Sequence, residues 1–290
     1  MSDPPIDPDR YVRASSITEK YYRDVYPAIN PSKPEFSQTG KVTIITGAGK
    51  GIGRGIARTH ATAGVKALVL ITKSIESGEE TQALIQAEFP SLEVLALPTD
   101  ITDEMAVNRT FNTIKHRFGT ADTLINNAAS LTSARIEESD PTKWWNNFET
   151  NVRGTYLVTA AFLRLVAADT QPTIINIISS ISLTTPGLSS YLMSKLSVAK
   201  FTEFIAAENP SVRAYSLSPG MVVTGLTVEA FKPYSRDTPE LTGAVTVYLA
   251  AKRPEYLNGR HLSVNWDLEE LEGRKEEIAL SDLLRVGQFL

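Results

Sequence analysis

Seven short apolar segments, separated by stretches of helical periodicity, constrain the fold of this chain more than any other feature. The segments are uninterrupted rather than alternating, which indicates strands buried on both faces, as in a parallel sheet. Because parallel strands need crossover helices, the pattern predicts a single doubly wound α/β domain with a parallel sheet of about seven strands. The predicted strands are 42–45, 67–71, 92–97, 123–125, 174–178, 212–217 and 261–264.

Cap and turn residues mark the ends of several predicted helices. Ser77, with Glu80 three positions later, has the pattern of a capping box. An aspartate before proline at 140–141 and a threonine before proline at 238–239 predict two further helix starts. Gly119 predicts the end of the helix before it. The charge run 269–277 alternates in sign and predicts a solvated helix.

Charge and cysteine content exclude several classes of function. The chain has 290 residues, with 29 basic and 33 acidic side chains and a net charge of −4, so it is a poor candidate for binding nucleic acid or anionic membranes. It has no cysteine, which excludes disulfides, zinc–thiolate sites and a thiol nucleophile. His60, His116 and His261 lie far apart in the sequence, so we expect no metal centre. No apolar run reaches the ~20 residues of a membrane span and no signal pattern is visible, so we expect a soluble cytoplasmic protein.

The chain divides by composition into three parts. Residues 1–38, the N-terminal arm, are rich in proline and aromatic residues, and too many aromatics are present for a free tail. We therefore expect the arm to pack on the domain, or to contact a subunit or the substrate. Residues 39–265 form the predicted dinucleotide-binding and catalytic domain, and residues 266–290 are a C-terminal extension.

A glycine-rich turn follows the first strand and opens a helix. Its sequence, 46–53, is Thr-Gly-Ala-Gly-Lys-Gly-Ile-Gly. Glycines let the backbone approach a diphosphate, and the unpaired N–H groups of the following helix attract the anion. This context, between a buried strand and a helix, predicts a dinucleotide site of the Rossmann type.

The spacing of this turn and four later motifs resemble the short-chain dehydrogenase/reductase family over residues 40–265. The motifs are Asn-Asn-Ala-Ala at 126–129, with alanine where the family has glycine, Asn151, Tyr-x-x-x-Lys at 191–195 and Pro-Gly at 219–220. The segment 263–267 and the N-terminal arm resemble a group of fungal reductases, many of which act in secondary metabolism. The resemblance assigns to the dinucleotide Gly47, Gly49, Lys50, Gly51, Ile52, Gly53, Lys73, Asp100, Ile101, Asn127, Ala128, Tyr191, Lys195, Pro219, Gly220, Val222 and Thr224.

The end of the second strand favours NADP(H) over NAD(H), which remains an alternative. An acid there binds the ribose 2′-hydroxyl of NAD, whereas a basic residue accommodates the 2′-phosphate of NADP. This strand ends in a lysine, Lys73, and Lys50 lies within the glycine turn. Either lysine has the alternative reading of a solvated surface charge. Asp100 matches the family residue that meets the adenine, or else caps the helix that starts near Asp103.

Tyr191 and Lys195 lie four residues apart, which places them on one face of a helix. A phenol with a pKa near ~10 is a poor proton donor and acceptor at neutral pH, and a neighbouring ammonium lowers that pKa. The resemblance implies that Tyr191 is the general acid/base and that Lys195 also binds the nicotinamide ribose. It further implies that a serine polarises the substrate oxygen. Ser179 fits best, with Ser180 or Ser182 as alternatives.

Asn151 falls in the long helix that begins at 141, where asparagine is unfavourable by propensity. The resemblance implies that Asn151 holds a water that links Lys195 to solvent. The alternative is that the Asn151 side chain faces solvent. Residues 225–240 cover the substrate in this family. Here they are apolar and aromatic, although Lys232 and Arg236 leave room for an acidic ligand.

These observations predict an oxidoreductase that interconverts a ketone and a secondary alcohol on a medium-sized, largely apolar molecule. Relatives pair through two long helices, here about 141–168 and 189–207, so we expect a homodimer or homotetramer. Two alternatives remain, a non-redox isomerase or cyclase on the same fold, and a dinucleotide-sensing protein without turnover.

Overall fold

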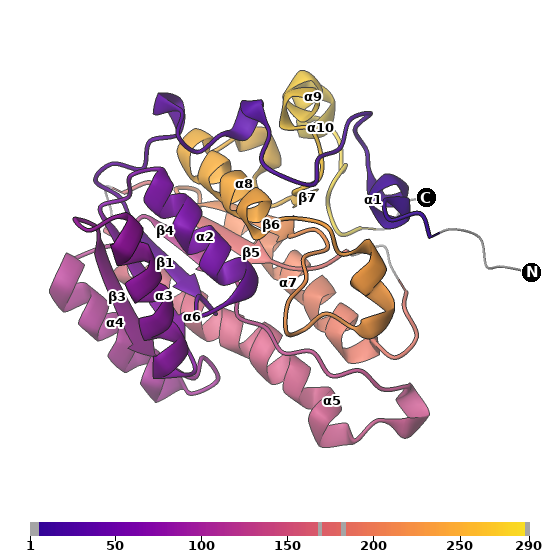
Figure 1. The fold of residues 1–290 in the computed structure, drawn as a ribbon, viewed down its shortest axis with the longest axis horizontal. Helices are drawn as coiled ribbons and strands as arrows, with labels where there is room; N and C mark the ends of the chain where they lie inside the picture. The colour runs from indigo at the N-terminus through magenta and orange to yellow at the C-terminus, as the bar shows by residue number, and fades with distance from the viewer. Residues whose placement is uncertain (1–5, 168–169, 181–183, 288–290) are drawn as a thin grey trace, which may run out of the picture.

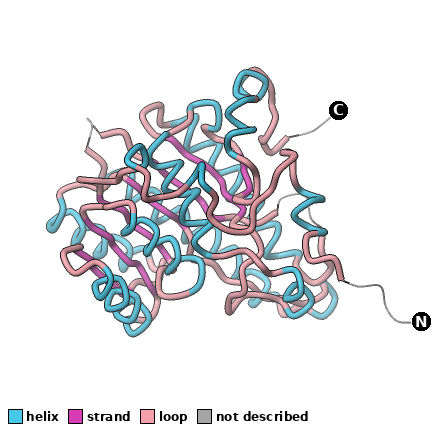
Figure 2. Tube along the Cα trace, turned by 45° about the horizontal axis from the view of Figure 1, so that its top comes forward, coloured by secondary structure: helices cyan, strands magenta, loops and turns pink. Residues whose placement is uncertain are grey.

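The computed structural model describes residues 6–167, 170–180 and 184–287. In these residues seven parallel strands form one sheet in the order β3-β2-β1-β4-β5-β6-β7. Figure 2 shows the strands in the middle of the molecule with helices around them. The doubly wound fold is therefore confirmed, and each strand begins and ends within one residue of its predicted position. The strands are β1 (Val42–Thr46), β2 (Ala67–Thr72), β3 (Glu93–Pro98), β4 (Thr123–Asn126), β5 (Thr173–Ile177), β6 (Arg213–Ser218) and β7 (His261–Ser263).

Helices cover both faces of the sheet (Figure 1). One face packs against α2 (Gly51–Thr62), α3 (Ile75–Glu88) and α8 (Pro239–Lys252) through side chains such as Ile56, Ile85 and Leu241. The other packs against α4 (Glu104–Phe118), α6 (Thr155–Leu165) and α7 (Ser189–Glu208), with Phe111, Phe162 and Ile205. Burial on both faces accounts for the continuous apolar pattern of the strands. In the described part of the chain, no helix is long and apolar enough to cross a membrane.

The helix caps agree with the sequence at three places and differ at one. Thr238 and Asp140 each accept a hydrogen bond from a backbone N–H of the following first turn, and Gly119 ends α4 with a positive φ of 79°. The prediction of a capping box that starts at Ser77 is wrong. Ser74 is the N-cap of α3 and accepts from the N–H of Ser77, which lies inside the first turn. Glu80 stands three positions after Ser77 and favoured the later start, whereas no acid stands three positions after Ser74.

The helix predicted over 141–168 is interrupted. The structure has α5 (Pro141–Phe148), a six-residue π-helical turn η4 (Glu149–Gly154), and α6, which ends at Leu165. Asn151 lies in the π-helical turn and is only 1% exposed, so the solvent-facing alternative is wrong. The charge run 269–277 also spans two short helices, α9 (Leu268–Gly273) and α10 (Lys275–Ala279), rather than one.

The N-terminal arm runs from the β7 side of the molecule past α8 to the end of α2 (Figure 1). Its aromatic side chains pack, as their number predicted: Tyr26 and Phe36 are buried, and Tyr22 stacks on Tyr26. Tyr21 forms an antiparallel bridge with Trp266, which joins the arm to the C-terminal extension. The remaining short elements are α1 (Arg10–Ser15), η1 (Pro27–Ile29), η2 (Pro34–Phe36), η3 (Ile136–Glu138), η5 (Glu229–Tyr234) and η6 (Glu255–Leu257).

Candidate active site

The loops that follow β1 to β6 meet at one edge of the sheet, because all carboxyl ends of a parallel sheet lie on that edge. They line a cleft of about 1710 Å³. Every residue assigned to the dinucleotide from the sequence lines this cleft, and so do Ser179 and Ser180. Asn151 does not line it, and Ser182 lies outside the described residues.

The glycine turn is held tightly against the loop after β4. Gly47 has a φ of 66°, and a Cβ there would lie 2.8 Å from the Cα of Ala128. The Asn127 side chain donates to the carbonyls of Thr46 and Gly47 at 3.0 and 3.1 Å. The Thr46 hydroxyl in turn accepts from the N–H groups of Asn127 and Ala128, each at 3.0 Å. Asn127 therefore shapes the turn, and a side chain at Gly47 has no space.

Two further residues hold the turn, and the sequence analysis missed both. Arg54 donates to the carbonyl of Gly49 at 2.7 Å and to the hydroxyl of Thr81 at 3.0 Å. The Thr81 hydroxyl also donates to the Gly49 carbonyl at 3.0 Å. Arg54 follows the last glycine of the motif by one position, but its partner on α3 is far away in sequence. The contact was therefore not readable from spacing.

At the end of β2, Lys73 and Asp100 pair with each other, Nζ to Oδ2, at 2.6 Å. The Lys73 side chain is 83% exposed. Asp100 also accepts from the N–H and the hydroxyl of Thr102. Although partial burial raises the pKa of Asp100, the hydrogen bonds from Lys73 and Thr102 outweigh burial and lower it to about 2. The cap of α4 is Asp103, so Asp100 is no helix cap.

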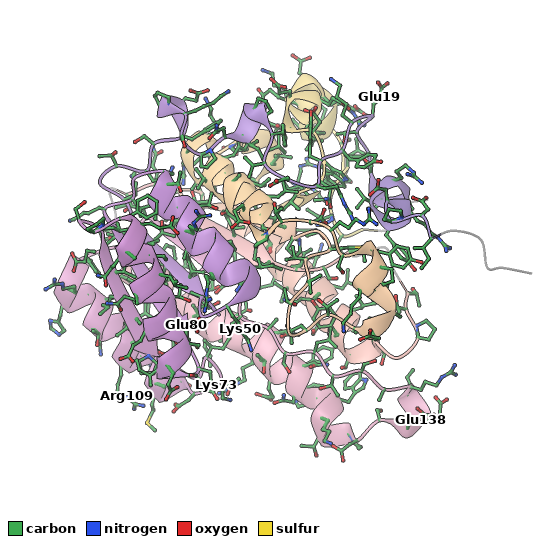
Figure 3. The ribbon with its side chains drawn as sticks, viewed as in Figure 1. Glu19, Lys50, Lys73, Glu80, Arg109 and Glu138 are labelled. Carbon is green, nitrogen blue, oxygen red and sulfur yellow. The ribbon has the colours of Figure 1, made fainter. Side chains whose placement is uncertain are left out.

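Lys50 lines the same cleft beside the loop that follows β6. It precedes the first turn of α2, and a Cβ on Gly225 would lie 3.8 Å from its Nζ. Figure 3 shows Lys50 and Lys73 near the starts of α2 and α3, and both line the cleft. The N-terminal end of the α2 dipole and the Lys50 ammonium are suited to phosphate, whereas the charge of Lys73 is balanced by Asp100 in this structure.

Tyr191, Lys195 and Ser179 meet in the middle of the cleft. Ser179 and Tyr191 line the cleft together, and the Lys195 Nζ lies 5.8 Å from the centre of the Tyr191 ring. Lys195 Nζ donates to the carbonyl of Ile177 at 2.8 Å. These three residues come from a stretch of the sequence in which Ser179 and Lys195 are sixteen positions apart.

The protonation of this pair differs from the prediction. Burial raises the pKa of Tyr191 to about 12, and the hydrogen bond from Ser179 offsets only part of that rise. Burial lowers the pKa of Lys195 to about 8. The expectation that the lysine lowers the tyrosine pKa is wrong for this structure, because burial outweighs what lowers it. The ammonium donates to the Ile177 carbonyl.

Asn151 lies behind the cleft, where its amide is fully used. Its Oδ1 accepts from the N–H of Ser130 at 2.8 Å, and its Nδ2 donates to the Ser130 carbonyl and the Ser194 hydroxyl, each at 2.9 Å. The Ser194 hydroxyl donates to the carbonyl of Tyr191 at 2.7 Å. Asn151 thus connects the π-helical turn, the loop after β4 and the turn of α7 that carries Tyr191.

The loop after β6 is held by an aspartate that the sequence analysis did not single out. Asp237 is buried and accepts from the backbone N–H of Met221 and from Asn265 Nδ2, the latter at 3.0 Å. Burial raises its pKa to about 6, although the Met221 N–H and Arg23 both lower it. Farther along this loop, the Thr224 hydroxyl accepts from the N–H of Leu226 at 3.2 Å.

A doubly wound sheet with a glycine-rich first turn and a cleft at its carboxyl edge defines a nucleotide-binding α/β protein. The family model described as short chain dehydrogenase matches residues 41–235. "Short chain dehydrogenase mpl6" of Monascus purpureus is 38% identical, over 93% of this chain and 96% of that protein. "Short chain dehydrogenase andI" of Emericella variicolor is 37% identical, over 93% and 95%. The chain belongs to the short-chain dehydrogenase/reductase family, whose members are oxidoreductases that bind nicotinamide dinucleotides.

A solved structure agrees with this assignment. The 3-ketoacyl-(acyl-carrier-protein) reductase from Brucella melitensis, complexed with NADH, superposes with a TM-score of 0.71 at 27% identity. The match covers 98% of that chain but only 79% of this one. This protein therefore carries segments beyond the shared fold, and the family match excludes residues before 41 and after 235.

Proposed function

We propose that the protein is an NADP(H)-dependent oxidoreductase that interconverts a ketone and a secondary alcohol on a medium-sized, largely apolar molecule. The observation that carries this proposal is that Tyr191, Ser179 and Lys195 line the same cleft as the glycine turn. Because the chain resembles fungal reductases that act in secondary metabolism, we also assign its reaction to secondary metabolism, in the cytoplasm.

The residues at the positive end of the cleft fit a phosphorylated dinucleotide. Gly47 has no side chain to keep a diphosphate from its backbone, and the start of α2 faces the cleft. Lys50 and Lys73 each carry a positive charge. We assign the 2′-phosphate to these two lysines, because the second strand ends without the acid that would bind an unmodified ribose. When bound, the nicotinamide supplies the hydride in reduction and accepts it in oxidation.

The remaining chemistry is the movement of one proton. Because the pKa of Tyr191 is about 12, its phenol is protonated at neutral pH and ready to donate to the oxygen of a ketone. Ser179 holds that oxygen and stabilises its developing charge. Lys195, whose pKa is about 8, is mostly charged at neutral pH and stabilises the phenolate that remains. In oxidation the same groups act in reverse.

Asn151 enters this proposal as a positioning residue. Its amide is bonded to Ser130 and Ser194, and Ser194 is bonded to the carbonyl of Tyr191. It therefore fixes the orientation of the α7 turn that presents the phenol. We assign Asn151 this positioning role instead of the water-holding role that the resemblance implies.

The cleft favours an uncharged substrate. Lys232 is paired with Glu229 at 2.6 Å, and neither Lys232 nor Arg236 is among the described residues that line the cleft. The wall contains Leu188, Leu192 and Phe231 instead. An acidic group on the ligand would therefore meet neither of these two cations in the described cleft.

We propose that the protein pairs with a second copy through α5, α6 and α7. Trp145, Tyr156 and Phe204 are each 54% exposed on these helices. Large aromatic side chains left in solvent are typical of a surface that another chain covers.

The test of the function is ketone-dependent oxidation of NADPH by the purified protein. Cyclohexanone and 2-tetralone serve as small and bicyclic neutral ketones, with NADPH and NADH compared at equal concentration. We expect consumption of NADPH with at least one ketone and a lower kcat/KM with NADH. Conversion of substrate without any change in NADPH absorbance would instead favour non-redox chemistry.

A further inference from the structure

The N-terminal arm reaches the same cleft as Tyr191, although it lies outside the region that the family model matches. Tyr11, Val12 and Ala14 of α1 line the cleft, and so do Ser15 and Ile17. In Figure 1, α1 lies at the end of the molecule opposite β3. The arm therefore borders the substrate side of the cleft rather than the end that holds Lys73.

Tyr11 joins the arm to the loop that covers the substrate side. Its ring meets the ring of Phe231 edge-on at 5.6 Å and that of Tyr234 at 4.8 Å, and both belong to η5. Edge-to-face aromatic pairs of this kind stabilise a fixed arrangement of the rings. Tyr11 and Phe231 both line the cleft, so together they form one aromatic wall.

A buried ion pair fixes where the arm sits on this loop. Arg23 Nε lies 3.1 Å from Asp237 Oδ1, and Arg23 also donates to the carbonyl of Tyr234 at 2.6 Å. Asp237 is the residue that accepts from the N–H of Met221, in the loop after β6. Removing one partner of a buried pair leaves the other charge without compensation, so this contact holds the arm against the loop after β6.

The C-terminal extension holds the arm from the other side. Trp266 Nε1 donates to the carbonyl of Ser15 at 3.0 Å, and the Tyr22 N–H donates to the carbonyl of Asn265 at 2.9 Å. Ser15 is thus held in the cleft wall by contacts on both sides of α1. The arm therefore forms part of the cleft wall.

The chemistry of this wall is aromatic and uncharged. Among the described residues, the charged side chains that line the cleft are Lys50, Lys73, Asp100, Lys195 and Arg285. The first four lie at the phosphate end or beside Tyr191, and Arg285 faces Asp282 at 3.8 Å. The arm itself offers a phenol ring, a serine and aliphatic side chains.

We propose that the N-terminal arm forms the outer wall of the substrate site and that Tyr11 is a specificity-determining residue that selects neutral aromatic ketones. The proposal rests on the proposed function in that it assigns this end of the cleft to the carbonyl substrate. It goes beyond the family fold, because the wall comes from a segment before residue 41.

The chain has no cysteine, so a single introduced thiol reports on one position. We would compare the rate at which N-ethylmaleimide modifies Ser15→Cys, in the cleft wall, and Lys20→Cys, an exposed control on the same arm. The ligand is 2-naphthol, a neutral bicyclic phenol that cannot be oxidised to a ketone, in the presence of NADP+. We expect 2-naphthol to slow modification of Ser15→Cys about fivefold or more and to leave Lys20→Cys unchanged.

Equal rates for Ser15→Cys with and without 2-naphthol would overturn the proposal. Protection by NADP+ alone would also contradict it, because it would place the arm against the dinucleotide. This readout needs no turnover. It therefore decides the role of the arm even if the protein reduces no ketone, in which case only the proposed function fails.

Kinetics supply the second test. Tyr11→Ala should raise the KM for 2-tetralone about tenfold, with a much smaller change for cyclohexanone and none in the Kd of NADPH. Tyr11→Phe keeps the ring and should recover most of that loss, while Lys20→Ala should match the wild type. If Tyr11→Ala affects both ketones equally or neither, Tyr11 does not determine specificity, and the proposed function still stands.

Discussion

Burial in the cleft shifts the pKa values of Tyr191 and Lys195 in opposite directions, upward to about 12 and downward to about 8. Both shifts favour the uncharged form, as expected when a group loses water. A protonated phenol is the form that reduction of a ketone requires. At the scale of single residues, the folded site therefore holds the phenol in the protonated form that can donate to a ketone oxygen.

Lys73 supports the 2′-phosphate assignment at the same scale. Lys73→Ala should weaken NADPH binding about tenfold and leave the Kd of NADH unchanged, because a charge-assisted bond to phosphate is lost from an exposed site. The measurement is fluorescence titration of both dinucleotides. Lys66→Ala is a matched control, since Lys66 is exposed just before the opposite end of β2. An unchanged NADPH-to-NADH ratio in Lys73→Ala would refute the assignment.

Spacing in the sequence brought Tyr191 and Lys195 to one helix face, and the motif order placed the glycine turn and Ser179 beside them. Protonation was not predictable in this way. It depends on burial and on the carbonyl of Ile177, which becomes a partner of Lys195 only once β5 packs beside α7. The pairing of Lys73 with Asp100 likewise arises from two loops that meet only in the fold.

At the scale of elements, the strands were the most predictable part, because burial on both faces leaves an unbroken apolar run. Interruptions of the helices were not predictable from the sequence. The π-helical turn η4 follows α5 without any proline or glycine before Gly154 to mark it. What stabilises it is a set of contacts from Asn151 to Ser130 and Ser194, both distant in sequence.

Asn151→Ala should therefore lower the free energy of unfolding by about 2–4 kcal/mol. The substitution leaves the N–H and carbonyl of Ser130 and the hydroxyl of Ser194 without this partner, and unsatisfied buried groups are costly. Urea unfolding measures the change. Asn112→Ala, on the exposed side of α4, should shift stability by less than about 0.5 kcal/mol. Equal effects of the two substitutions would show that Asn151 does not stabilise the turn.

At the scale of the whole molecule, His60 connects the sheet to its helical layer. Its ring is fully buried in α2, 3.4 Å from the Thr43 hydroxyl on β1 and 3.2 Å from the Thr246 hydroxyl on α8. Burial lowers the pKa of His60 to about 3. The imidazole is thus neutral in the folded protein well below the pH at which it becomes charged in the unfolded chain.

This difference makes stability depend on pH. Between about pH 6.5 and pH 3 the unfolded chain binds a proton that folded His60 does not, so stability falls as pH falls through this range. Wild type should lose about 1.4 kcal/mol per pH unit more than His60→Gln between pH 6 and pH 4. Urea unfolding at several pH values gives both slopes. Comparing slopes removes the opposite contribution of Asp237, whose pKa is raised to about 6. Parallel slopes would contradict a neutral buried His60.

The arm and the C-terminal extension complete the molecule around the cleft. Composition alone indicated that the aromatic arm packs, but its contact with η5 through Tyr11 was not readable, because the two lie more than two hundred residues apart. The same holds for Arg23 and Asp237. Sequence patterns encode local structure and shared motifs, whereas this wall depends on where the ends of the chain return to the sheet.

The central claim is that Tyr191 donates the proton during reduction in this cleft. The most direct measurement is single-turnover oxidation of bound NADPH by saturating 2-tetralone, in wild type and in Tyr191→Phe. We predict that Tyr191→Phe still binds NADPH but turns over at least about a hundredfold more slowly. Wild-type turnover in Tyr191→Phe would contradict the account.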